Sequence, residues 1–96
     1  MTTDHKPEPD YQKFATEAGV DAFKLLVDRS EQALAEREFV EIFTAMVAAA
    51  ELCFANVLRP AVEMSPAPEK TADALLETSM KHIRELLKPV IEKKQP

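Results

Sequence analysis

The stretch Phe39–Leu58, FVEIFTAMVAAAELCFANVL, decides the fold because it is long, mostly apolar and free of glycine and proline. Glu41 and Glu51 are its only charged residues. The segment predicts a helix, and at 3.6 residues per turn its apolar side chains fall on two adjacent stripes. Seam 1 consists of Phe39, Phe43, Met46, Ala50, Cys53 and Val57, and seam 2 consists of Val40, Val47, Phe54 and Leu58. A helix with two apolar seams needs partners on most of its sides.

The same stretch is long enough to cross a membrane, since a transmembrane helix needs about 20 mostly apolar residues. Its composition argues against a span. Glu51 would lie near the middle of the bilayer, where a carboxylate costs roughly 3 kcal/mol, and the many alanines contribute little. We therefore predict no membrane segment, and because no secretory signal pattern opens the chain, the expected compartment is the cytoplasm.

The composition predicts a single all-α domain. The chain has 96 residues with one glycine, and β-hairpins and bulges depend on glycine. Its formal net charge of -5 argues against general nucleic-acid binding, which depends on neutralising phosphates. Its single cysteine cannot form an internal disulfide.

The pattern of apolar residues predicts a small up-down bundle of three to four helices, completed by dimerisation. Residues 1–9 contain two prolines and no apolar residue after Met1, so we expect a disordered tail there. Residues 10–96 form the predicted helical domain. The expected helices cover approximately residues 10–18, 21–35, 38–59 and 66–92.

Two breaks separate the first three predicted helices. Gly19 suits a left-handed helix stop and Asp21 is a natural N-cap. One helix running through Gly19 is the alternative, at a cost of about 1 kcal/mol relative to alanine. The second break follows from Leu34 and Phe39: five residues rotate a helix by about 140°, so a continuous helix would change its apolar face abruptly. An unbroken helix there would fit only an extended oligomer.

Pro60 predicts an end or a kink of the central helix, because a proline disfavours helical dihedral angles at the preceding Arg59. Residues 60–68, PAVEMSPAP, contain three prolines and predict a stiff linker. In the last helix we expect a kink or a break at Pro89. Its seam advances by four and three residues alternately, the spacing of a helix packed on a partner, through Ala72, Leu76, Ser79, Ile83, Leu86 and Val90.

The number of large apolar side chains predicts self-association. Five phenylalanines and two methionines form a large apolar set for about eighty ordered residues: Phe14, Phe23, Phe39, Phe43, Phe54, Met46 and Met80. The central helix has two apolar seams, whereas the central helix of a monomeric bundle needs one broad seam. We expect a homodimer with a two-fold interface, formed by Phe39, Phe43, Met46, Val47, Phe54, Val57 and Leu58. The alternative is that helices of the same chain cover both seams.

No motif predicts catalysis or a bound cofactor, so the expected function is a non-enzymatic protein–protein interaction module, such as an adaptor, a chaperone-like protein or an inhibitor. Lys81, Arg84 and Lys88 are candidates for contact with an unknown protein partner, although cations near a helix C-terminus also complement its dipole. The alternative function is a nucleic-acid-associated regulator that uses this basic helix. It lacks helix-turn-helix spacing and a dense arginine cluster.

Two further places in the sequence carry residues capable of metal binding or nucleophilic chemistry. His82 and Glu85 have the spacing of metal ligands, but Ser79 stands where a bundle metal site would need another glutamate. We therefore predict no metal site. Cys53 has apolar neighbours, and we expect it to be a buried structural thiol, not a nucleophile.

Overall fold

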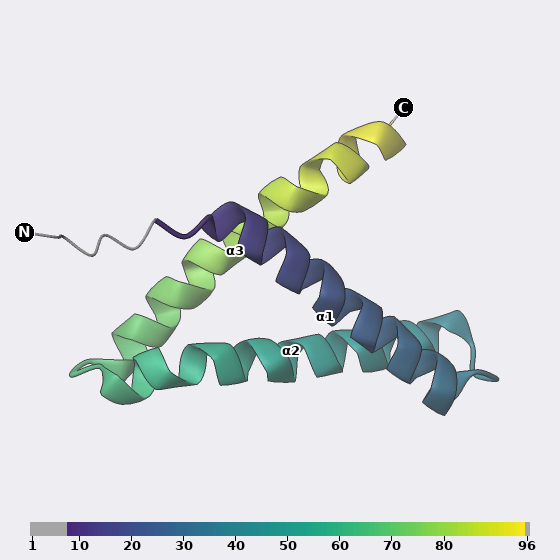
Figure 1. Ribbon diagram of the computed structural model, residues 1–96, viewed down its shortest axis with the longest axis horizontal. Coiled ribbons are helices and arrows are strands. Elements are labelled where there is room, and N and C mark those ends of the chain that lie inside the picture. Colours follow the sequence, from purple (N-terminus) through teal and green to yellow (C-terminus); the bar gives the residue numbers. More distant parts are fainter. Residues whose placement is uncertain (1–7, 96) are drawn as a thin grey trace, which may run out of the picture. The chain divides into compact units, whose positions relative to one another are not determined.

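The computed structural model describes residues 8–95, and all regular secondary structure in that range is helical (Figure 1). Within this range the helices are α1 (Tyr11–Leu34), α2 (Phe39–Met64) and α3 (Pro68–Lys94). The prediction of an all-α chain is confirmed. The predicted tail over residues 1–9 lies almost entirely outside the described residues.

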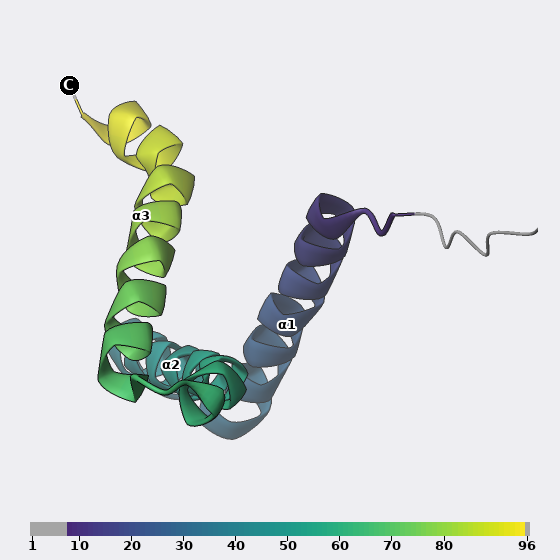
Figure 2. The ribbon, with the colours of Figure 1, turned by 90° about the vertical axis from the view of Figure 1, so that its left-hand side faces the viewer.

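Helix α1 starts at an aspartate cap and runs through Gly19 without interruption (Figure 2). The backbone N–H of Lys13 donates to Asp10 Oδ1 at 3.0 Å, which satisfies one of the free amides of the first turn. Gly19 does not have the positive φ that a left-handed stop requires. The prediction of separate helices over 10–18 and 21–35 is therefore wrong. The good helix formers on both sides outweigh the cost of about 1 kcal/mol for one interior glycine.

The predicted break between Leu34 and Phe39 is confirmed. Residues 35–38 form a turn in which the backbone N–H of Arg37 donates to the Leu34 carbonyl oxygen at 3.0 Å. The chain thus changes direction where the apolar face would otherwise have rotated by about 140°.

Helix α2 continues through Pro60 to Met64, so the predicted end at residue 59 is wrong. The predicted linker over 60–68 shortens to three residues between α2 and α3. Pro60 costs the helix one backbone hydrogen bond because it has no N–H. Leu58 and Val62, on either side of it, are both half-buried and line one hollow with Ala72 of α3. This packing stabilises the last turn of α2 in its helical conformation.

Helix α3 begins at Pro68, two residues later than predicted, with the proline in the first turn where its missing N–H costs nothing. Ser65 organises the short turn before it. Its hydroxyl accepts from the backbone N–H of Ala67 at 3.0 Å and shares a 2.6 Å hydrogen bond with the hydroxyl of Thr71. Pro89 lies inside α3, and the helix continues past it to Lys94. A break at Pro89 is therefore absent, and a kink there stays a prediction.

The chain divides into two compact units, Met1–Ala50 and Glu51–Pro96, with the division inside α2. Unit 1 contains α1 and the first half of α2, and unit 2 contains the second half of α2 and α3. Among the described residues, no hydrophobic side chain is fully buried, and Ser30 is the one buried residue. Its hydroxyl donates to the Val27 carbonyl oxygen at 2.8 Å, which satisfies it within α1. Each unit therefore has a helix–helix contact and no enclosed core.

Candidate protein interaction surface

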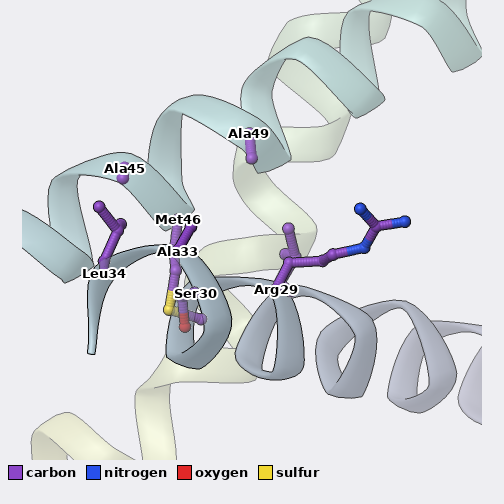
Figure 3. Close-up of a pocket in the computed structure, with 8 residues that line it drawn as sticks. Arg29, Ser30, Ala33, Leu34, Ala45, Met46 and Ala49 are labelled. Atoms are coloured by element: carbon purple, nitrogen blue, oxygen red, sulfur yellow. The ribbon is translucent and has the colours of Figure 1, made fainter.

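In unit 1, α1 and α2 meet near the turn that joins them. Figure 3 shows the side chain of Met46 on α2 reaching toward Ser30 and Ala33 on α1. These residues line a shallow hollow of about 170 Å³, together with Leu26, Arg29, Leu34, Ala45 and Ala49. Met46 is half-buried as a result. One of the predicted interface residues, Met46, therefore already packs against another helix of the same chain.

In unit 2, the end of α2 lies against the start of α3. Leu58 and Val62 share a hollow of about 450 Å³ with Ala72 and Leu76. Phe54 and Leu58 are half-buried, while most other side chains of this half of α2 are exposed. Two more of the predicted interface residues are therefore partly covered by the chain itself.

The rest of the predicted interface on α2 is exposed. Phe39, Phe43 and Val57 are 77%, 55% and 67% exposed, and Val47 is 40% exposed. The first three belong to seam 1, whose small residues Ala50 and Cys53 are exposed as well. We call these five exposed residues of seam 1 the open seam: Phe39, Phe43, Ala50, Cys53 and Val57. At 100° per residue they lie within about 40° of one line along the helix.

Two aromatic rings dominate one end of the open seam. Phe39 and Phe43 stack with their ring centroids 6.0 Å apart and their planes inclined by 22°. The pair lies one turn apart on α2, the spacing at which helical side chains meet. Together the two rings form an exposed aromatic patch, and aromatic side chains bury large apolar areas when a partner covers them.

Cys53 is a free, exposed thiol, so the prediction that it is buried is wrong. The sequence placed it correctly on seam 1, and the error arose from assuming that seam 1 would be covered. Its exposure follows from the exposure of the whole open seam.

Helix α2 is, within residues 8–95, the one helix that is long and apolar enough to cross a membrane by length and composition. One such helix is weak evidence, because the mostly buried core helix of a soluble protein and a signal sequence pass the same test; in α2 none of the apolar window is buried. Glu41 and Glu51 are both exposed on the polar side of α2. The absence of a membrane segment stays a prediction.

The three predicted partner-contact residues lie on α3. Lys81 Nζ is 3.8 Å from Glu77 Oε1, and both side chains are about three-quarters exposed, so this ion pair contributes little to stability. Arg84 borders a shallow hollow of about 320 Å³ formed by Met80, Ile83, Leu87 and Ile91. Lys88 lies at the edge of a neighbouring hollow with Arg84 and Glu92. The sequence did not show that an apolar stripe beside Arg84 would remain open.

In the part of the chain that the structure describes, no three side chains of His, Cys, Asp or Glu gather as a metal site would require. His82 and Glu85 remain a pair with metal-ligand spacing alone. The chain matches no protein family model, and comparisons with curated proteins and with solved structures found no significant similarity.

Proposed function

We propose that this protein is a non-enzymatic protein–protein interaction module that acts as a homodimer, with the open seam of α2 as its main contact surface. The observation that carries the proposal is the exposure of most large apolar side chains among residues 8–95, above all the stacked pair of Phe39 and Phe43. Contiguous exposed apolar stripes on soluble proteins usually mark binding surfaces, because leaving them in water is unfavourable.

A second copy of the chain is a suitable partner because the open seam is self-complementary in size. Phe43 and Ala50 lie seven residues apart, nearly two turns, and within about 20° of each other around α2. In an antiparallel pair of α2 helices related by a two-fold axis, the same side of each helix faces the other copy. The large ring of Phe43 then lies opposite the small Ala50 of the second copy, and Ala50 receives the second ring in return.

The proposal does not require catalysis or a cofactor. An adaptor, a chaperone-like protein or an inhibitor acts by holding another chain, for which an exposed aromatic and aliphatic surface is sufficient. The half-buried residues Met46, Phe54 and Leu58 are partly covered within their own units and are not assigned to the contact.

Sedimentation equilibrium of the wild type and of Phe43→Glu tests the proposal. We expect a dimer or larger species for the wild type. The variant should have a clearly lower average molecular mass at the same concentration, because a carboxylate replaces a ring in the contact. Ala48→Glu is the matched control: it adds the same charge to α2, about 140° away from Phe43 around the helix. Equal masses for the wild type and both variants would contradict the α2 contact.

A further inference from the structure

Helix α3 extends well beyond the part of α2 that lies in the same unit. It has 27 residues, whereas Glu51–Met64 of α2 is about 20 Å shorter at 1.5 Å per residue. The half-buried residues of α3 all lie in its first half, at Thr71, Ala72, Leu75 and Ser79. Every residue from Met80 to Lys94 is exposed.

An apolar stripe follows this exposed part of α3. Its members are 45–63% exposed and share one side of the helix: Leu76, Met80, Ile83, Leu87 and Ile91. We call this set the α3 stripe. The centre of the stripe lies about 100° around the helix from the middle of the four half-buried residues. Leu76 also borders the hollow shared with Leu58 and Val62 of α2, and the four members from Met80 onward are exposed beyond that contact. Four of its members line a single hollow along the helix together with Arg84.

Charged residues border the α3 stripe on one side, and their signs change along the helix. After Lys70 near the start of the helix, Asp73 and Glu77 are followed by Arg84 and Lys88. At 100° per residue the last four lie within about 60° of one another, next to the stripe. We call them the charged flank. Within residues 8–95, Arg84 and Lys88 take part in neither of the two ion pairs found, and Glu77 makes only its exposed 3.8 Å contact with Lys81.

This order of charges is self-complementary in an antiparallel pair. When two α3 helices are related by a two-fold axis perpendicular to them, the charged flank of one copy faces the charged flank of the other. In one register of this pair, Leu76 lies at the same height along the helix axis as Leu87 of the second copy, and Met80 at the same height as Ile83. Glu77 and Arg84 of the second copy then differ in height by about 3 Å. Asp73 and Lys88 of the second copy differ in height along the helix axis by the same amount. Each contact then contains four opposite-charge pairs beside an apolar seam.

A parallel arrangement lacks this match. The charged flank of one helix would then face the opposite side of the other stripe, where Leu86 and Val90 lie and no acidic residue pairs with Arg84. Charge complementarity therefore selects the antiparallel orientation, as it does for helices that pair through flanking charges.

We propose that α3 is a second self-association surface, on which the α3 stripe and the charged flank bind those of a second copy in antiparallel orientation. This contact lies wholly within unit 2 and is separate from the contact proposed for the open seam of α2. A chain with two different two-fold contacts can build assemblies larger than a dimer.

A charge-reversal experiment in the full-length chain tests the α3 contact. One variant carries Asp73→Lys and Glu77→Lys, which makes its flank entirely basic; the other carries Arg84→Glu and Lys88→Glu, which makes its flank entirely acidic. Each variant alone should need roughly tenfold or more protein to reach the wild-type mass, because like charges face each other. The equimolar mixture should recover the wild-type mass, and so should the chain with all four substitutions.

The control variant carries Glu85→Lys and Glu92→Lys, which changes the net charge by the same amount as the basic variant. Both residues lie on the side of α3 away from the stripe, so its mass should equal that of the wild type. Circular dichroism of each chain reports whether α3 remains helical. The proposal is overturned if the two variants alone keep the wild-type mass, or if neither the mixture nor the fourfold variant recovers it. Neither result depends on Phe43→Glu, so failure of the α3 contact and failure of the α2 contact are distinguishable.

Discussion

Phe39 and Phe43 stack on α2 with a centroid distance of 6.0 Å, yet they remain 77% and 55% exposed. Each ring covers part of the other, and neither is enclosed by the helices around it. Exposed rings add little to folding, and the proposed α2 contact would cover this pair.

The size match in the proposed α2 contact predicts a compensating pair of substitutions. Phe43→Ala should weaken self-association because it removes a ring, and Ala50→Phe should weaken it because two large rings then face each other. The double variant moves the ring to position 50 and the small residue to position 43, so it should recover much of the affinity of self-association. Sedimentation velocity over a dilution series measures all three. A double variant that associates no better than the weaker single variant would contradict the antiparallel orientation.

Gly19→Ala should stabilise the chain by about 0.5–1 kcal/mol, since alanine favours a helix over glycine by that amount. The added Cβ meets no atom within 4 Å, and the backbone does not have a positive φ there. Urea denaturation at one fixed protein concentration measures the change. Ala18→Gly, at the neighbouring exposed position, is the control and should lower the free energy of unfolding by a similar amount. A loss of stability in Gly19→Ala would show that α1 breaks at this residue.

Ser65→Ala should destabilise the chain by about 1 kcal/mol, because the hydroxyl organises the turn before α3 through Ala67 and Thr71. Thr44→Ala is the comparison. The hydroxyl of Thr44 only donates back to the Val40 carbonyl oxygen within α2, and alanine is the better helix former, so no loss is expected. Chemical denaturation of both variants at equal concentration measures the difference. Equal effects would show that Ser65 has no special role in the turn.

Duplex DNA of random sequence should show no measurable binding, even at low salt. The chain has a formal net charge of -5, and among Lys81, Arg84 and Lys88 one acidic residue, Glu85, interrupts the basic run on α3. Fluorescence anisotropy of a labelled duplex measures this directly. Binding that weakens steeply as salt is added would instead support the alternative of a nucleic-acid-associated regulator.

The sequence predicted the helical class and the turn between Leu34 and Phe39, because a rotation of the apolar face is a property of the pattern itself. It failed at Gly19 and Pro60 for a common reason. One unfavourable residue costs about 1–3 kcal/mol, and neighbouring helix formers or contacts such as Leu58 and Val62 near α3 can exceed that cost. Local propensity correctly marks both residues as unfavourable in a helix, but both lie inside helices in the structure.

The interaction surface was predicted in part. The pattern placed Phe39, Phe43 and Val57 on one seam, and the structure leaves all three exposed. It could not show that Met46 would be half-buried, because the hollow beside Ser30 depends on how α1 crosses α2. For the same reason the sequence identified the apolar residues of α3 without showing which of them α2 covers.

The most direct test of the account is the mass of the wild-type chain in solution across a wide concentration series, measured with a dye that reports exposed apolar surface. We expect the mass to rise from monomer to dimer or beyond, and the dye signal per chain to fall as association covers the open seam. A chain that stays monomeric at the highest concentration and binds no dye would contradict the proposed self-association. Its apolar side chains would then be covered without a second molecule.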